Sequence, residues 1–178
     1  MPTALPHLLL TGTPGVGKTT VLRKLAGHLD ARTLGGFYTE EIRVHGERRG
    51  FRLVTFDGAE RVIAHVDFPK AKQVGKYGVD VAALDEMVEA ALAPRPELSL
   101  YLVDEIGRME CLSGRFVAAM RRLLDSGKRV VATIAQRGEG FIAEVKRRPD
   151  CELSTVTREN RDALPRQLLE RLAASAHG

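Results

Sequence analysis

The stretch that most constrains this chain is GTPGVGKT, residues 12–19. It fits the pattern G-x-x-x-x-G-K-[ST] at every fixed position. An apolar run at residues 5–10 precedes it, and apolar spacing predicts an amphipathic helix over 18–29. Glycines let the backbone turn so that its N–H groups face a phosphate, and a helix N-terminus adds positive charge there. We therefore predict a phosphate-binding loop (P-loop) between a buried strand and a helix.

Two side chains give this loop its chemistry. The Lys18 ammonium can reach the β- and γ-phosphates of a nucleotide, and the Thr19 hydroxyl can coordinate Mg²⁺. We assign Lys18 a catalytic role and Thr19 a metal-binding role. A glycine-rich turn without a ligand is the alternative, but it gives no reason for lysine next to threonine. The predicted nucleotide-binding residues of the loop are Gly12, Thr13, Pro14, Gly15, Val16, Gly17, Lys18 and Thr19.

Two adjacent acids, Asp104 and Glu105, end the apolar run at residues 98–103. Burying a carboxylate is costly unless it is paired or binds a metal. In proteins with a P-loop, an acid at the end of a neighbouring core strand holds Mg²⁺, so we assign Asp104 to the metal. Glu105 follows where the chain leaves the sheet and can orient and deprotonate an attacking water. The pair favours hydrolysis over a nucleotide or small-molecule kinase, because a kinase would lose its triphosphate to water.

Weaker candidates lie elsewhere in the sequence. Thr133 ends an apolar strand and can hydrogen-bond the attacking water or the γ-phosphate, although a locally satisfied strand threonine is an equal alternative. Asn160 and Arg161 can approach the base or ribose. Four arginines can each supply positive charge to the transition state, as an arginine finger does: Arg108, Arg137, Arg147 and Arg148.

Strands and helices alternate along the chain, which predicts an α/β fold with a mostly parallel sheet flanked by helices. An antiparallel β-meander of three strands interrupts this alternation near residues 36–68. We expect residues 1–178 to form a single domain. The other expected strands are 98–103, 128–135 and 151–156, and the other expected helices are 80–92 capped by Asp80, 113–125 capped by Ser113, 139–147, and one capped by Asp162.

The composition excludes several classes of protein. The hydrophobic fraction is 44% and the charged fraction 28%, which is typical of a soluble globular domain, and the apolar runs are too short to span a bilayer. The N-terminus has no basic region before its apolar run, so we expect no secretory signal and no membrane partner. Two cysteines forty residues apart and scattered histidines give no zinc spacing. We therefore expect a cytoplasmic protein whose cofactor is Mg²⁺.

The net charge of +4 raises the question of whether the protein binds nucleic acid. Basic clusters occur at residues 43–52 and 146–148, and either a polyphosphate surface or an ordinary solvated face accounts for them. The chain has six phenylalanines, three tyrosines and no tryptophan, and it carries no recognisable nucleic-acid motif. A nucleic-acid-stimulated ATPase is therefore an alternative that we do not favour.

Several longer stretches carry a family resemblance. The chain resembles the P-loop nucleoside-triphosphatases that include the thermophilic and human cancer-related nucleoside-triphosphatases. The combination of GFYTEE with DEIGRME is more specific than the P-loop. The matching stretches are residues 12–20, 35–43, 46–58, 74–80, 103–116 and 156–164.

The resemblance implies a RecA-like fold and slow, Mg²⁺-dependent hydrolysis of ATP, GTP and other nucleoside triphosphates to diphosphates. Residues 12–19 would bind the phosphates. One departure is Ala135, since the family usually has proline at that position after Thr-Ile. The residues implied to complete the nucleotide site are Tyr101, Leu102, Val103, Asp104, Glu105, Ile106, Gly107 and Arg108.

Overall fold

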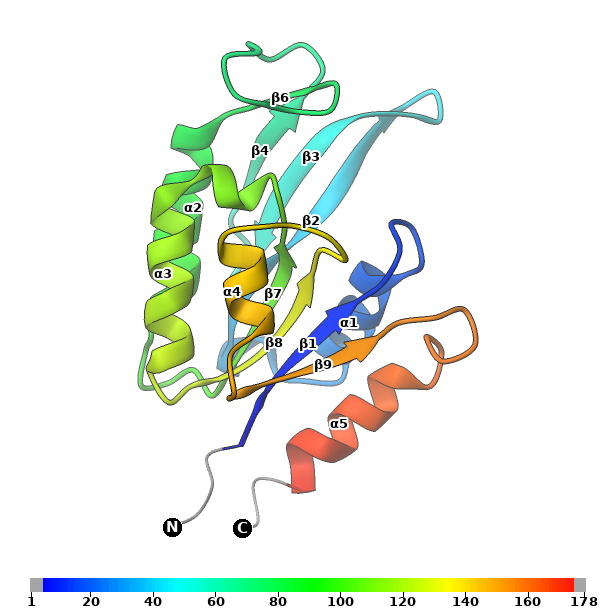
Figure 1. Cartoon of the computed structure of the whole chain (residues 1–178), viewed down its shortest axis with the longest axis vertical. Helices are drawn as coiled ribbons and strands as arrows, with labels where there is room; N and C mark the ends of the chain where they lie inside the picture. Colours follow the sequence, from blue (N-terminus) through cyan, green and yellow to red (C-terminus); the bar gives the residue numbers. More distant parts are fainter. Residues whose placement is uncertain (1–4, 175–178) are drawn as a thin grey trace.

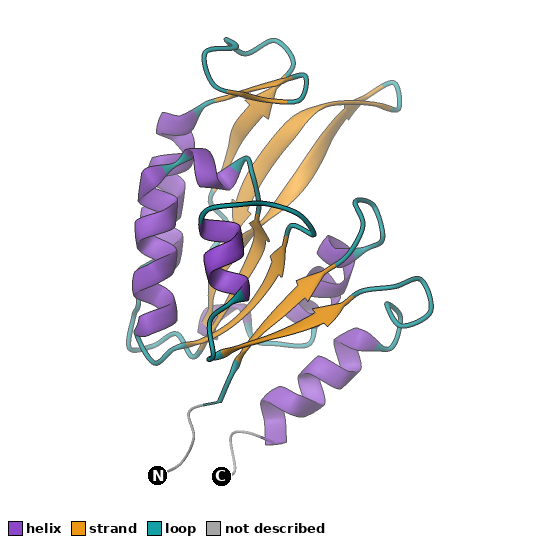
Figure 2. Ribbon diagram, in the orientation of Figure 1, coloured by secondary structure: helices purple, strands orange, loops and turns teal. Residues whose placement is uncertain are grey.

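A computed structural model describes residues 5–174 of the chain. Its centre is a nine-stranded mixed sheet in the order β5-β6-β4-β3-β2-β7-β8-β1-β9, with helices on both faces (Figures 1 and 2). This confirms the predicted α/β architecture. The elements are β1 (His7–Thr11), α1 (Lys18–Gly27), η1 (Ala31–Thr33), β2 (Leu34–Val44), β3 (Glu47–Thr55), β4 (Glu60–His65), β5 (Gln73–Val74), β6 (Tyr77–Val79), α2 (Val81–Leu92), β7 (Leu100–Ile106), η2 (Glu110–Leu112), α3 (Gly114–Asp125), β8 (Arg129–Ile134), α4 (Phe141–Lys146), β9 (Cys151–Thr155) and α5 (Leu164–Ala174).

The parallel part of the sheet consists of β2, β7, β8, β1 and β9. Because these strands run in one direction, their carboxyl ends meet at one edge of the sheet, where ligands bind in open α/β folds. The strand with the two acids, β7, does not pair with β1, since β8 lies between them. The expectation that the acid-bearing strand neighbours the P-loop strand is therefore wrong by one strand.

The predicted antiparallel meander exists, but it is not a separate insertion. Strand β2 pairs parallel with β7 over Leu34–Phe37 and antiparallel with β3 over Phe37–Val44, so one long strand belongs to both parts. Strand β4 extends this hairpin, as expected. The sequence analysis missed β5 and β6, because strands of two and three residues are too short to show an alternating pattern.

Apolar residues of the central strands alternate between two cores, one on each face of the sheet. Leu9, Tyr101 and Val103 pack with residues of α2, α3 and α4. Leu8 and Leu102 pack with residues of α1 and α5 on the other face. None of the described helices combines the length and the apolar composition needed to cross a membrane.

Two of the three predicted helix caps are confirmed. The Asp80 carboxylate accepts a hydrogen bond from the Ala83 N–H at 2.9 Å, and the Ser113 hydroxyl accepts one from the Phe116 N–H at 2.9 Å. The prediction that Asp162 caps the last helix is wrong. That residue lies in the turn before α5, which begins at Leu164.

Candidate active site

The P-loop connects the carboxyl end of β1 to the start of α1. Its tip, residues 13–15, is exposed, whereas Val16 is buried in the core beneath it. Gly12 has a φ of +153°, and a Cβ there would lie 2.8 Å from the Val156 carbonyl oxygen, so only glycine fits against the backbone after β9. The N-cap Gly17 has a φ of +114°. The loop thus has an exposed tip on a restrained base, next to the N-terminus of a helix.

The turn before α5 supports this loop from outside. Arg161 donates a hydrogen bond from Nη1 to the Val16 carbonyl oxygen at 3.0 Å. The Asn160 side chain is used within its own turn, where it bonds the Thr155 carbonyl oxygen and the Thr157 N–H at 2.8 Å each. The sequence analysis expected both side chains near the base or ribose. In the structure Asn160 shapes the turn and Arg161 holds the P-loop.

Replacing Arg161 with alanine is expected to weaken nucleotide binding by on the order of tenfold, because the hydrogen bond from a charged group to Val16 is lost. The turnover number should change less than the Michaelis constant, since the reacting groups stay in place. Arg158→Ala is the matched control, because Arg158 is an exposed arginine of the same turn. Equal nucleotide affinities of the two variants would contradict a supporting role of Arg161.

Asp104 is almost fully buried, at 1% exposure, and three threonine hydroxyls converge on its carboxylate. Thr19 donates to Oδ2 at 2.9 Å, Thr39 to Oδ2 at 3.3 Å, and Thr133 to Oδ1 at 2.6 Å. These bonds compensate the burial of the charge. The expectation that Thr133 faces the water or γ-phosphate is not met, because its buried hydroxyl donates to Asp104. Sequence reasoning missed Thr39, whose only signal was its place in the GFYTEE stretch.

Glu105, like Asp104, belongs to β7, and its side chain reaches the P-loop. The register of β7 against β8 shifts between Val103 and Ile106, and the peptide bond between Asp104 and Glu105 is cis. The Glu105 carboxylate lies 3.3 Å from the Lys18 ammonium. The side chain of Glu105 is about one-third exposed. The two residues to which we assigned catalytic roles thus form an ion pair at the edge of the sheet.

The other side chains of the stretch 101–108 lie mostly in the interior of the protein. Tyr101, Leu102, Val103 and Ile106 are fully buried, with their side chains in the two cores. The Tyr101 hydroxyl donates to the Ala93 carbonyl oxygen at 2.7 Å, which ties it to the loop before the strand. The assignment of the whole stretch to the nucleotide site stays a prediction. Asp104 and Glu105 reach the P-loop, and Arg108 is exposed beyond them.

Comparison with known proteins places this geometry in a family. The sequence matches the protein family described as NTPase over residues 7–169. The chain belongs to this NTPase family. A nucleoside-triphosphatase THEP1 from Thermotoga petrophila is 43% identical, with 91% of this chain and 90% of the relative covered. A cancer-related nucleoside-triphosphatase homolog from Bos taurus is 34% identical, with 95% and 97% covered.

Solved structures agree with this family membership. The crystal structure of THEP1 from Aquifex aeolicus superimposes with a TM-score of 0.84 at 36% identity, covering 93% of this chain and 98% of that one. The solution structure of a human cancer-related nucleoside triphosphatase gives a TM-score of 0.81 at 33% identity, with 96% and 98% covered. The family resemblance and the fold class expected from the sequence are both confirmed.

This NTPase family member has a second buried acid beside Glu105, which sequence reasoning missed. Glu110 is 5% exposed, and burial together with the Glu105 charge raises its pKa to about 8. Both carboxyl groups crowd Gly107: a Cβ on that glycine would lie 2.6 Å from Glu105 Oε1 and 2.9 Å from Glu110 Oε2. The raised pKa favours the protonated, neutral form of the Glu110 carboxyl group.

The raised pKa of Glu110 predicts a pH-dependent stability. The folded protein keeps this proton up to about pH 8, whereas the unfolded chain loses it near the ordinary value of 4.5. Stability from this group is therefore complete below pH 4.5 and is lost as pH rises toward 8. Across pH 5–8 the melting temperature of wild type should fall several degrees more than that of Glu110→Gln, measured by thermal unfolding. Parallel curves would contradict the assignment.

The four arginine-finger candidates do not share one position in this NTPase fold. Arg148 donates hydrogen bonds to Asp125 and Asp150, both at 2.7 Å, so its charge is already paired. Arg147 is exposed just after α4. Arg108 follows β7 and Arg137 follows β8, so both lie at the edge where the P-loop is, and both are exposed.

The basic cluster at residues 43–52 is largely neutralised by acids of the same hairpins. Each of its arginines has a carboxylate within 4 Å, and most of these groups are exposed. Paired surface charges of this kind offer little net positive field to a polyanion. This finding weakens the case for nucleic acid. The pairs are Arg43 with Glu41, Arg48 with Glu41, Arg49 with Asp67, and Arg52 with Glu60.

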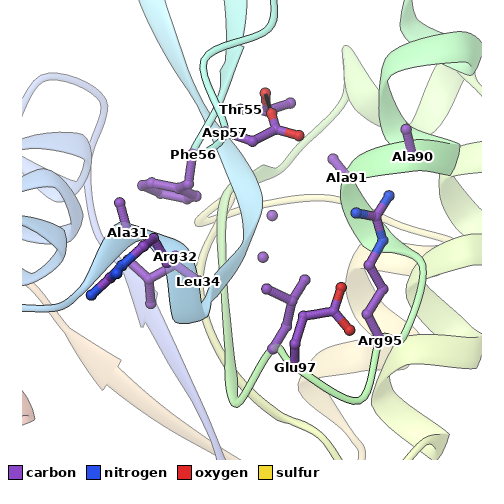
Figure 3. A pocket seen from close by; sticks show the side chains of 13 residues that line it. Ala31, Arg32, Leu34, Thr55, Phe56, Asp57, Ala90, Ala91, Arg95 and Glu97 are labelled. Atoms are coloured by element: carbon purple, nitrogen blue, oxygen red, sulfur yellow. Dashed lines mark hydrogen bonds between the residues drawn. The ribbon is translucent and has the colours of Figure 1, made fainter.

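Two hollows among the described residues differ in their distance from the P-loop along the fold. The one beside the P-loop has a volume of about 320 Å³ and is lined by residues that include Lys24, Arg161 and Asp162. The other, of about 410 Å³, lies between the start of β2, the end of β3 and the end of α2, with Phe56 and Arg95 on its walls (Figure 3). Only the first adjoins residues predicted to bind a nucleotide.

Proposed function

We propose that this chain hydrolyses the terminal phosphate of nucleoside triphosphates, ATP and GTP among them, with Mg²⁺ as its metal and water as the acceptor. The observation that carries the proposal is the meeting of two pairs at one edge of the sheet. Lys18 lies 3.3 Å from Glu105, and Thr19 lies 2.9 Å from Asp104. Membership of the NTPase family supports the same reaction.

Thr19 and Asp104 fit a magnesium ion. Both present hard oxygen atoms, which Mg²⁺ prefers, and they already lie in contact. The described residues contain no cluster of three or more acids, histidines or cysteines that could hold a metal by themselves. Mg²⁺ does not need one, because it keeps several waters and takes phosphate oxygens of the substrate. When bound, the ion supplies charge that neutralises the β- and γ-phosphate oxygens.

The threonines around Asp104 have a positioning role in this proposal. Thr39 and Thr133 donate hydrogen bonds to the carboxylate from β2 and β8, so it is held from two strands. A fixed carboxylate loses little conformational freedom when it binds a cation.

Lys18 and Glu105 have different roles in the proposed reaction: Lys18 binds the phosphates and Glu105 accepts a proton from water. A triphosphate in the P-loop competes with Glu105 for the Lys18 ammonium, which leaves the carboxylate available to a water molecule. Glu105 accepts the proton of that water as its oxygen bonds to the γ-phosphorus and the bond to the diphosphate oxygen breaks. The helix N-terminus and the P-loop N–H groups hold the phosphates in place during this step.

Two alternatives have less support. No observation favours a nucleotide or small-molecule kinase over a hydrolase, and the relatives are named as triphosphatases. The paired arginines of residues 43–52 argue against stimulation by nucleic acid.

Phosphate release from ATP, GTP, CTP and UTP tests the proposed function directly. We expect release from several of the four with Mg²⁺, none above background with a chelator, and no requirement for an acceptor or for nucleic acid. Formation of diphosphate only after adding a phosphoryl acceptor, with the phosphoryl group on that acceptor and no free phosphate, would support a kinase instead. Phosphate release that depends on added RNA or DNA, and that falls steeply with salt concentration, would support a nucleic-acid-stimulated ATPase.

A further inference from the structure

The short helix α4 carries a lysine to the edge of the sheet where the candidate active site lies. Lys146 is its last residue, and Nζ donates a hydrogen bond to the Gln136 carbonyl oxygen at 2.8 Å. Gln136 follows β8 by two residues, and its neighbour Ala135 donates its N–H to the Ile106 carbonyl oxygen at 3.1 Å. The ammonium is thus anchored beside the ends of β7 and β8.

The charge of Lys146 is not compensated locally. Within residues 5–174 its ammonium has a neutral carbonyl as hydrogen-bond partner and no carboxylate within 4 Å. The side chain is half-buried. Burial and the positive charge of Lys18 both lower the pKa of Lys146, so the two ammonium groups act on the same region. Lys18 is paired with Glu105 at 3.3 Å, whereas the hydrogen-bond partner of Lys146 is a neutral carbonyl, so the charge of Lys146 is the one left for an anionic ligand.

Lys146 differs from three of the arginines considered for the same task, either in charge pairing or in being held by a hydrogen bond. Arg148 is paired with two aspartates. Arg108 and Arg137 lie at the correct edge but are exposed, and the structure gives their charged groups no hydrogen bond that holds them in place. A charge that is already held at the reaction centre stabilises a transition state better than one that must first be ordered.

We propose that Lys146 contacts the terminal phosphate of the bound nucleotide and stabilises the charge that develops there, the task an arginine finger performs in other P-loop enzymes. This rests on the proposed function. The cation is supplied by the same chain that binds the nucleotide, so hydrolysis needs no activating partner. Helix α4 and the loop before it, residues 135–140, form the support that holds Lys146 over the phosphates.

Lys146→Ala and Lys146→Gln test the proposal, with Lys128→Ala as the matched control. Lys128 also donates from Nζ to a backbone carbonyl, that of Leu98 at 2.9 Å, but it precedes β8 and so lies at the opposite edge. The Lys146 variants should lose on the order of 10²–10³ in kcat with KM changed only a few-fold, and Lys146→Arg should restore most of the rate. Lys128→Ala should behave as wild type.

A binding measurement separates a phosphate contact from a merely structural role. ADP with aluminium fluoride mimics the phosphoryl group in transfer, and its affinity for Lys146→Ala should fall by a factor similar to the loss in kcat. The affinity for ADP alone should be unchanged. Equal losses for ADP alone, or wild-type kcat in both Lys146 variants, would overturn the proposal.

The remaining outcomes are also decisive. If Arg108→Ala or Arg137→Ala shows the large loss in kcat and the Lys146 variants do not, that arginine supplies the positive charge to the transition state and the proposal is wrong. If wild type itself releases no phosphate with Mg²⁺, the proposed hydrolase function fails, and the role of Lys146 fails with it. Normal release by wild type with an unchanged Lys146→Ala overturns the role of Lys146 alone.

Discussion

Glu105→Gln is expected to lower kcat by on the order of 10²–10⁴ while leaving nucleotide affinity close to that of wild type. Glutamine has nearly the same shape but cannot accept the proton of the attacking water. The substitution also removes the charge that pairs with Lys18 at 3.3 Å, so the lysine becomes freer to bind phosphate. Phosphate release and equilibrium binding of Mg²⁺·ATP, measured on the same preparation, separate the two effects.

A matched control for this variant is Glu89→Gln. Glu89 forms an ion pair with Arg115 of the same length, 3.3 Å, between α2 and α3 and outside the candidate site. Its loss should leave turnover unchanged, because an exposed ion pair contributes little to stability. Unchanged turnover in Glu105→Gln would remove the water-activating role from Glu105, since no other feature of that variant compensates for a lost base.

The second large effect is expected for Asp104→Asn. The carboxylate accepts hydrogen bonds from three threonine hydroxyls, and the amide nitrogen of asparagine cannot accept the bond from Thr133 or Thr19 that it would face. An unsatisfied buried polar group costs about 1–3 kcal/mol, so the melting temperature should fall. Loss of the negative charge should lower kcat by on the order of 10² or more and raise the Mg²⁺ concentration needed for half-maximal activity.

A Mg²⁺ titration distinguishes loss of the metal ligand from a general loss of stability. Asp85→Asn is the control, because the Asp85 carboxylate also accepts a hydrogen bond from a hydroxyl, that of Ser113, away from the P-loop. This control should lower the melting temperature and leave the Mg²⁺ requirement unaltered. An Asp104→Asn enzyme with the Mg²⁺ requirement of wild type would exclude Asp104 as a ligand.

Features governed by local rules were predictable from the sequence. The strand and helix on either side of residues 12–17, the caps at Asp80 and Ser113, and the alternation of strands and helices depend on residues close together in the chain. The sequence analysis assigned Lys18 and Glu105 separate catalytic roles but did not predict their contact. That contact depends on the order of the strands in the sheet.

Features that depend on long-range packing were not predictable. Thr39 reaches Asp104 across 65 positions in the chain, and nothing local to either residue indicates that β2 will pair with β7. The burial of Glu110 beside Gly107 is likewise a result of tertiary packing, which no periodicity reveals.

The side chains of the stretch 101–108 divide into a buried group and a group near the P-loop. Transfer of a whole motif from the family marked eight consecutive residues as nucleotide-binding. In a strand, however, successive side chains point to opposite faces, and the central residues of a covered sheet are buried on both. Tyr101, Leu102 and Val103 belong to the cores for this reason, whereas residues at the carboxyl end of the strand reach the P-loop.

Hydrolysis of ATP in ¹⁸O-labelled water tests the central claim most directly. With Mg²⁺ present and no acceptor added, wild type should release phosphate that carries one ¹⁸O atom from water, together with unlabelled ADP, and a chelator should stop the reaction. Glu105→Gln should yield the same labelled product at a rate lower by at least about 10². Unlabelled phosphate, label in the nucleotide product, or no release without an acceptor would contradict a Mg²⁺-dependent attack of water on the γ-phosphorus.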